Sequence, residues 1–195
     1  MTSTPVPADL RTDRLYLRSW RTTDAALLLP ALEANVDHLS NWIPAHVATP
    51  APLPDLELRL AKFAEDFLAG RYWRYAIFPR DESDLLGEVS LFPRSAEGRV
   101  EFAAADRLEI GYWLRSDVTG KGYATESARA MLQLSLALPG IRQVEIHCDP
   151  RNVSSAAVPQ RLGFRLASAD AEPASIPSHE PATMLWVFDV RAAHS

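Results

Sequence analysis

Several features are scarce in this sequence of 195 residues, and each shortage excludes a class of protein. The chain holds a single cysteine, Cys148, so no disulfide can form within it. No apolar run approaches the roughly 20 residues that a membrane-spanning helix needs. The formal net charge is -5, and this lack of excess positive charge argues against a protein that coats nucleic acid. We therefore expect neither a membrane protein nor a direct nucleic-acid binder.

Metal-binding and export patterns are missing as well. The five histidines show no i, i+4 pairing and have no cysteine partners, so we expect no metal site. The start of the chain has neither the basic nor the apolar region of a secretory signal, which indicates a cytoplasmic protein. Lysine is scarce too, since two of the 20 basic residues are lysines, Lys62 and Lys121. The second of these stands between two glycines.

Length and hydrophobic patterning predict a single mixed α/β domain over residues 1–195. Alternating apolar and polar residues, or short β-branched runs, predict strands at residues 14–20, 71–78, 85–92, 107–114, 143–148 and 183–190. Apolar stripes at helical spacing predict helices over residues 25–39, 55–70 and 124–138, and a short helix that ends at Gly163. The links between the second, third and fourth strands favour an antiparallel meander.

Two further local features bear on this layout. Pro30 lies within the first helical pattern and predicts a kink or a restart there. Residues 167–182 are rich in alanine, proline and serine, which predicts a long loop. That loop is expected either to cover the acceptor site as a lid or to be a disordered surface segment.

The stretch "DVTGKGYATESARAML", residues 117–132, places Gly120 and Gly122 directly before a helix. A glycine-rich turn at a helix N-terminus exposes backbone N–H groups at the positive end of the helix dipole, so it favours an anion such as phosphate. The nucleotide-triphosphate loop is excluded, because Lys121 is followed by glycine instead of Ser or Thr. The dinucleotide fingerprint is excluded, because Thr125 stands where its third glycine belongs. An ordinary strand-to-helix turn is the alternative.

A second stretch follows in order, "VEIHCDPRNVSSAAVPQRLGF", and together with "LEIGYWLRSDVTGKGYATESA" it resembles the GNAT acyltransferases, especially the branch that acetylates N-terminal amines of ribosomal proteins. "DRLYLRSWRTTDA" near the start extends the resemblance over most of the chain. It implies a central twisted sheet of about six or seven strands, mostly antiparallel, with helices on both faces. It also implies acetyl-CoA, entering where two central strands diverge.

The resemblance further implies which residues hold the cofactor. The pyrophosphate is expected on the backbone amides of the glycine loop, and the pantetheine arm against the last residues of the preceding strand and the turn that follows the next one. The implied residues are Trp113, Leu114, Thr119, Gly120, Lys121, Gly122, Tyr123, Ala124, Thr125, Asn152 and Ser155. Thr119 replaces the Arg or Gln that usually opens the family's loop, so Lys121 is a candidate for the missing phosphate contact.

For the chemistry, a base must take a proton from the ammonium and an acid must protonate the leaving thiolate. Glu109 is the candidate base, although a strand glutamate in a surface ion pair with Arg107 or another neighbour is an equal alternative. A backbone N–H from Leu114 is expected to stabilise the thioester oxygen. Many family members carry, at the position of Pro159, a tyrosine that acts as the general acid. Proline has no proton to donate, so Ser155 is assigned as the acid, with Tyr123 or a water as alternatives.

Acceptor recognition is the least determined part of the sequence. Trp42 and Trp73 are candidates for the wall of an acceptor pocket, with core packing as the alternative for both. Cys148 is expected to be buried and inert. The acceptor is a primary amine, either a protein N-terminus or a small molecule such as an antibiotic, polyamine or amino acid, and a non-catalytic acyl-CoA-binding module is the third possibility. Apolar residues around Leu53 to Leu60 suggest a homodimer.

Overall fold

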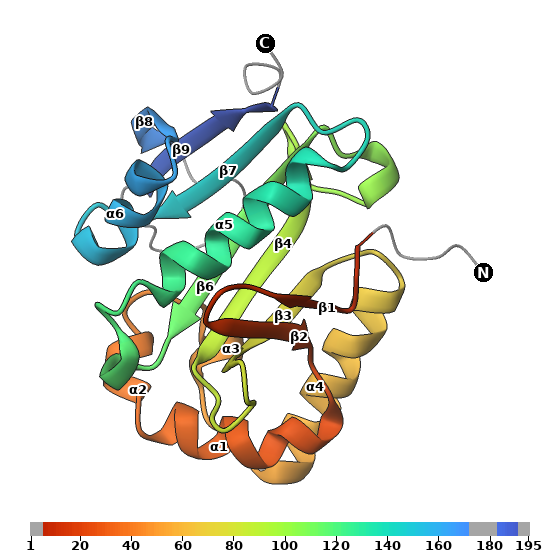
Figure 1. The fold of residues 1–195 in the computed structure, drawn as a ribbon, viewed down its shortest axis with the longest axis vertical. Coiled ribbons are helices and arrows are strands. Elements are labelled where there is room, and N and C mark those ends of the chain that lie inside the picture. Colours follow the sequence, from red (N-terminus) through yellow and green to blue (C-terminus); the bar gives the residue numbers. More distant parts are fainter. Residues whose placement is uncertain (1–5, 172–182, 191–195) are drawn as a thin grey trace.

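Within residues 6–171 and 183–190, which the computed structural model describes, nine strands form one sheet through the middle of the molecule (Figure 1). The strand order is β1-β2-β3-β4-β6-β7-β9-β8, and β5 pairs with β4 off this path. The strands are β1 (Asp9–Arg11), β2 (Leu15–Ser19), β3 (Trp73–Pro79), β4 (Gly87–Ser95), β5 (Gly98–Arg99), β6 (Arg107–Leu114), β7 (Gln143–Cys148), β8 (Arg165–Ala171) and β9 (Thr183–Asp189).

The helices of the described residues fall into two groups, one on each face of the sheet. The α-helices are α1 (Ala25–Glu33), α2 (Val36–Leu39), α3 (Ala45–Ala48), α4 (Leu53–Leu68), α5 (Tyr123–Leu136) and α6 (Val153–Arg161). Single 3-10 turns occur at Thr22–Asp24, Phe102–Ala104 and Ser116–Val118. None of the described helices is long and apolar enough to cross a membrane.

Each face of the sheet has its own hydrophobic core. In α5, Ala128, Met131 and Leu132 follow the i, i+3, i+4 spacing and are buried against strand residues such as Leu91 and Ile110. On the other face, the buried residues of α1 and α4 pack with Ala76, Phe78 and Trp113. Figure 1 shows α5 crossing one face of the sheet beside β6 and β7, while α1 and α4 lie apart from it around β3. Helices therefore cover both faces, as predicted.

The centre of the sheet contains its single parallel contact among the described strands, between β6 and β7. This contact is three residue pairs long, from Arg107 opposite Gln143 to Glu109 opposite Glu145. The following residues of β6 pair with β4 on one side, and the following residues of β7 pair with β9. The two strands therefore separate after Glu109, which confirms the expected divergence.

The predicted meander is confirmed, because β3, β4 and β6 pair in sequence order and antiparallel. The sheet has more strands than the six or seven expected. The short strands β1 and β5 were missed, and so was β8, which occupies residues 165–171 and pairs antiparallel with β9 where a loop was predicted from residue 167. The rest of that predicted loop, residues 172–182, lies outside the described residues.

The first helical pattern divides as its proline suggested. Helix α1 continues through Pro30 to Glu33, and a separate helix, α2, starts at Val36 after Asn35. The Asn35 side chain stabilises this break, since its amide donates to the Ala31 carbonyl at 2.8 Å and its oxygen accepts from the Ser116 N–H at 2.8 Å. The break thereby ties the helical segment to the end of β6.

Candidate active site

The glycine loop lines the larger of two cavities, which has a volume of about 850 Å³. Gly120 and Gly122 adopt φ angles of +73° and +83°, in the left-handed region that glycine enters at low cost. Helix α5 begins directly after Gly122, which cannot cap it with a side chain. The first N–H groups of α5 have no partner within the helix and face the loop side. The loop and the helix start thus form an anion site.

Lys121 is exposed, and its side chain is not among the residues that line this cavity. Its backbone carbonyl accepts a hydrogen bond from Arg14 Nη1 at 2.9 Å. Arg14 also donates to Glu126 Oε2 at 2.7 Å, so the β1–β2 hairpin holds both the loop and the first turn of α5. The structure therefore places Arg14, rather than the Lys121 side chain, against the cavity.

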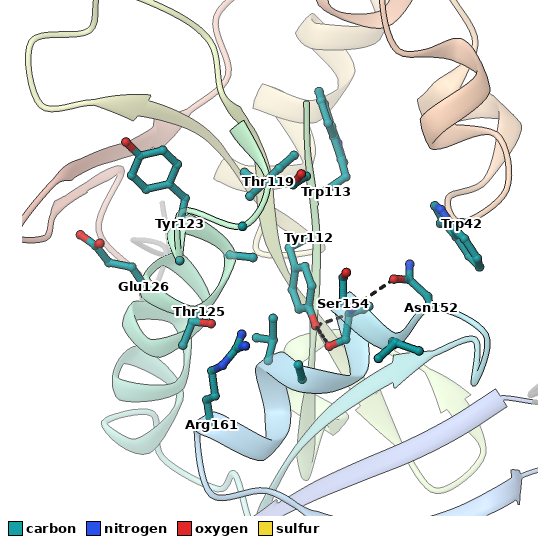
Figure 2. A pocket seen from close by; sticks show the side chains of 18 of the residues that line it. Trp42, Tyr112, Trp113, Thr119, Tyr123, Thr125, Glu126, Asn152, Ser154 and Arg161 are labelled. Carbon is teal, nitrogen blue, oxygen red and sulfur yellow. Dashed lines mark hydrogen bonds between the residues drawn. The ribbon is translucent and has the colours of Figure 1, made fainter. Parts of the chain in front are cut away.

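Sequence reasoning missed all four arginines that line this cavity, namely Arg14, Arg129, Arg151 and Arg161. Arg129 lies one helical turn after Thr125 on α5. Arg161 ends α6, and Figure 2 shows its side chain at the cavity. Both are exposed, and neither makes a hydrogen bond or ion pair with any residue in the described part of the chain. They are available to a phosphate group. Their separation along the sequence hid them, although the i, i+4 spacing from Thr125 to Arg129 was a readable signal.

The start of α6 forms the opposite wall. Asn152 caps this helix, because its Oδ1 accepts from the Ser155 N–H at 3.0 Å. Tyr112 extends from β6 toward the same helix (Figure 2), and its hydroxyl lies 3.0 Å from the Ser155 carbonyl and 3.2 Å from Ser155 Oγ. Burial raises the pKa of the Tyr112 hydroxyl well above its ordinary value, so it is a neutral hydrogen-bond donor. Tyr112 was missed, although it lies within the quoted "EIGYW".

The end of β6 presents a backbone donor to the gap between β6 and β7. The Arg115 N–H donates to the Leu86 carbonyl at the β4 end of the sheet. Because successive N–H groups of a strand point to opposite edges, the Leu114 N–H points away from β4, toward the gap. Trp113 and Leu114 both line the larger cavity, and their contact with the pantetheine arm stays a prediction.

The second cavity, of about 210 Å³, adjoins the larger one and is lined by residues of β4 and β6 and by residues between Trp42 and Val47. Glu109 reaches it from β6, with Oε2 accepting from Arg94 Nη1 at 2.6 Å. Glu109 therefore pairs with Arg94 and, more distantly at 3.7 Å, with Arg99, whereas Arg107 pairs with Glu145. Glu88 on β4, missed by sequence reasoning, also lines this cavity. Both cavities are lined by Trp42, Ile43, Tyr112, Trp113, Asn152 and Ser155.

The two tryptophan candidates have different positions. Trp42 lines both cavities and is 39% exposed. Trp73 is fully buried, packs edge to face against Phe102 at 5.1 Å, and lines neither cavity, so its assignment to an acceptor pocket was wrong. Trp73 packs in this way because it is the first residue of β3 and its side chain belongs to the hydrophobic core.

The same geometry bears on two other kinds of chemistry, a reactive Cys148 thiol and a bound metal ion. Cys148 lines the second cavity but is buried, and this burial raises the pKa of its thiol, which disfavours the reactive thiolate. Among the residues that the structure describes, no group of three or more His, Cys, Asp or Glu side chains could hold a metal ion. The two joined cavities instead offer an anion site at the start of α5 and carboxylates on β4 and β6.

Comparison with known proteins places this geometry in a family. The model of the GNAT acetyltransferase domain matches residues 14–165. Curated relatives include the probable N-acetyltransferase YjcK of Bacillus subtilis, 24% identical over 80% of this chain and 82% of that protein. The [ribosomal protein uS5]-alanine N-acetyltransferase of Escherichia coli is 26% identical over 80% of this chain and 77% of that protein.

Solved structures share the fold over nearly the whole chain. One is RimL, a ribosomal L7/L12 alpha-N-protein acetyltransferase in complex with coenzyme A, with a TM-score of 0.74, 21% identity, and coverage of 96% of this chain and 98% of that one. Another is the microcin C7 self-immunity acetyltransferase MccE in complex with acetyl-CoA and AMP, with a TM-score of 0.76, 20% identity, and coverage of 95% and 98%.

Proposed function

The chain belongs to the GNAT acetyltransferase family, and from this premise we propose that the primary amine it acetylates is the N-terminal amine of a protein. The observation that carries this proposal is the meeting of two cavities at Tyr112 and Ser155, one suited to a pyrophosphate and the other lined by carboxylates. A relative that acetylates a ribosomal-protein alanine supports the choice of acceptor.

The residues of the larger cavity fit acetyl-CoA. Bound acetyl-CoA supplies the acetyl group as a thioester, whose carbonyl carbon is attacked by the amine while the C–S bond breaks. We assign the backbone of residues 119–124, with Thr125, to the pyrophosphate, and Arg129 and Arg161 to further negative charge on the cofactor. Asn152 and Ser155 would face the pantetheine arm from the start of α6.

The proton transfers follow from the two walls of the site. Glu109 takes the proton that the acceptor ammonium must lose before its nitrogen can attack, directly or through a water. The Leu114 N–H, pointing into the gap, donates to the thioester oxygen as negative charge builds on it. Ser155 would donate its hydroxyl proton to the leaving thiolate and take up the second proton that the nitrogen loses as the amide forms, and its Oγ lies 3.2 Å from the Tyr112 hydroxyl. Pro159 has no proton to give.

The first experiment is calorimetry of the purified protein with acetyl-CoA, followed by thiol release with a panel of N-terminal peptides and small amines. We expect binding, and release that is fastest with a peptide. Faster thiol release with an antibiotic, polyamine or amino acid would show that the acceptor is a small molecule, as the likeness to MccE allows. Binding without release from any amine would instead indicate a non-catalytic acyl-CoA-binding module.

Substitution of the base tests the mechanism separately. Glu109→Gln should lower kcat by about 10²-fold to 10⁴-fold, the usual effect of losing a general base, with acetyl-CoA affinity retained. Glu97→Gln is the matched control, because Glu97 is exposed in the β4–β5 turn and lines neither cavity. If the Glu109→Gln variant has the same kcat as the Glu97→Gln control, Glu109 is not the base and serves only in a structural ion pair.

A further inference from the structure

The second cavity has more local positive charge than the acidic composition suggests. Each carboxylate among its described lining residues already has an arginine of its own. The pairs are Glu88 with Arg74, Glu109 with Arg94 and Asp149 with Arg151, each at 2.6 Å. No carboxylate of the cavity wall is therefore left to bind a cationic ligand without a competing arginine.

Arg99 is the arginine of the cavity wall that has no carboxylate within hydrogen-bond distance. It lines the cavity from β5 and its side chain is 44% exposed. Its nearest carboxylate atom is Glu109 Oε1, which lies 3.7 Å from Nη2 and is too distant for a hydrogen bond. Its guanidinium donates no hydrogen bond to any described residue, so all five of its N–H donors are available.

The orientation of this guanidinium is held by stacking. Its carbon atom lies 4.0 Å from the centre of the Phe92 ring, and the guanidinium of Arg74 lies 5.0 Å from the same centre. Two cations therefore share one aromatic ring at the cavity wall. A planar donor fixed in this way suits a carboxylate, which accepts two parallel hydrogen bonds from arginine.

His46, on α3 across the cavity, responds to the same charge. Burial lowers the pKa of the His46 imidazole, and nearby Arg74, Arg59 and Arg99 lower it further. The positive charge of Arg74 and Arg99 is therefore felt at the helix that lines the cavity.

We propose that the acceptor carries a carboxylate close to the amine that is acetylated, and that Arg99 binds this carboxylate. The inference rests on the proposed function, because the amine must face Glu109 while the carboxylate faces Arg99. A glutamate or aspartate beside an N-terminal amine meets this requirement, and so does a free acidic amino acid. A lysine or arginine at the same place would meet like charge from Arg99 and Arg74.

The test uses the full-length protein with acetyl-CoA and three C-terminally amidated peptides that differ only in their second residue, Glu, Gln or Lys. We expect kcat/KM to be about tenfold higher for the Glu peptide than for the Gln peptide, with the Lys peptide lowest, since a charge-assisted hydrogen bond contributes at least that factor. Free glutamate and free glutamine form a second arm, which distinguishes a peptide carboxylate from an amino-acid one.

Variants connect this preference to the residue. Arg99→Gln should lower kcat/KM for the Glu peptide about tenfold more than for the Gln peptide, while Arg99→Lys keeps part of the preference. Arg165→Gln is the matched control, because Arg165 pairs with Asp189 at 3.1 Å and lines neither cavity. Acetyl-CoA binding by calorimetry checks that each variant is folded.

The outcomes are distinguishable. Equal rates for the Glu and Gln peptides, a preference for the Lys peptide, or an unchanged preference in Arg99→Gln would overturn the inference alone. Acetylation of free glutamate but of no peptide would support the binding of a carboxylate by Arg99, and it would overturn the proposal that the acceptor is a protein N-terminus. Acetyl-CoA binding without thiol release from any of these amines would overturn the proposed function and this inference together.

Discussion

Gly87, at the start of β4, lies opposite Leu114 at the end of β6. A Cβ atom at this position would lie 2.1 Å from the Trp113 carbonyl oxygen and 2.9 Å from the Leu114 Cα. Both contacts are backbone atoms, which cannot rotate away. The absence of a side chain at Gly87 therefore keeps the end of β6 in the position that presents the Leu114 N–H to the gap.

From this geometry we predict that Gly87→Ala lowers the free energy of unfolding by about 3 kcal/mol, the upper range for overpacking, and reduces kcat. Gly140→Ala is the control, because a Cβ there meets nothing within 4 Å and only the left-handed backbone costs stability, about 1 kcal/mol. Urea unfolding measures both. Equal losses of stability in the two variants would show that the β4–β6 contact can shift at little cost.

At this scale the sequence predicted backbone roles better than side-chain roles. The glycines and Asn152 were identified because a turn and a helix cap depend on local sequence. Trp73 was misassigned, and Tyr112, Glu88 and Arg99 were missed, because their roles depend on which strands become neighbours. That pairing is fixed by the tertiary fold and leaves little trace in the residues on either side.

At the scale of elements, the β1–β2 hairpin holds α5 through one carboxylate. Glu126 Oε1 accepts from the Arg14 N–H at 2.9 Å and from Thr12 Oγ1, while Oε2 accepts from Arg14 Nε. Burial alone would raise the pKa of Glu126, but these hydrogen bonds outweigh it and lower that pKa. The loop that ends at Gly122 is thereby attached to the sheet.

Glu126→Gln should therefore weaken acetyl-CoA binding by about threefold to tenfold, since one or two charge-assisted hydrogen bonds that fix the loop are lost. Calorimetry measures the change. Glu65→Gln, in an exposed ion-pair network on α4, is the control and should leave the affinity unchanged. An unchanged affinity in Glu126→Gln would mean that the loop keeps its shape without the hairpin.

The short parallel contact between β6 and β7 depends on a second carboxylate. Glu145 is buried, and its Oε1 accepts from Arg107 Nη1 at 3.0 Å across the two strands. Burial raises the pKa of Glu145, but hydrogen bonds from His147 and Arg107 outweigh it, so that pKa lies below its ordinary value of 4.5. A depressed pKa in the folded state stabilises the fold above pH 4.5, and this stabilisation is lost as the pH falls through the folded-state pKa.

We predict that Glu145→Gln costs about 2 kcal/mol of unfolding free energy at pH 7, and that the difference from the unmutated protein shrinks below pH 4.5. Urea unfolding at a series of pH values checks this. A difference that stays constant down to pH 3 would show that Glu145 acts through packing and hydrogen-bond geometry instead of its charge.

Among the elements, long periodic segments were predicted well and edge segments were not. Strands β3, β4, β6 and helix α5 carry strong patterns, because they are buried on at least one face. Strand β8 has the polar sequence "RLASADA" and lies at the sheet edge, where pairing with one neighbour leaves little hydrophobic signal. The prediction of a homodimer through Leu53 to Leu60 stays open, with Leu58 exposed and Leu56 and Leu60 buried on α4.

At the scale of the whole molecule, cofactor binding should add to stability. A ligand at 100 times its Kd that binds only the folded state raises the unfolding free energy by about 2.7 kcal/mol. We expect this increase with acetyl-CoA and a smaller one with dephospho-CoA at the same concentration, because Arg129 and Arg161 have no other partners among the described residues. Denaturant unfolding measures both. Dephospho-CoA lacks the 3′-phosphate, so equal increases would show that these arginines do not bind that phosphate.

The family prediction is confirmed at this scale, because the ordered motifs extend over most of the chain and match the family model over residues 14–165. Net charge was less informative. An acidic chain suits a cationic acceptor in general, yet the wall of the second cavity includes the Arg99 guanidinium, which makes no hydrogen bond to any described residue. Total charge therefore predicts the behaviour of the molecule in solution better than the field inside one cavity.

The wall that the two cavities share also bears on the order of events in turnover. In the proposed function acetyl-CoA occupies the larger cavity and the acceptor occupies the second, and the two cavities meet along a wall that includes Tyr112 and Ser155. Both cavities can then be filled at once, and the buried Cys148 thiol is a poor carrier for an acetyl group. Steady-state kinetics should therefore show intersecting lines in double-reciprocal plots, the pattern of a ternary complex, and no exchange of label between acetyl-CoA and free CoA without an acceptor.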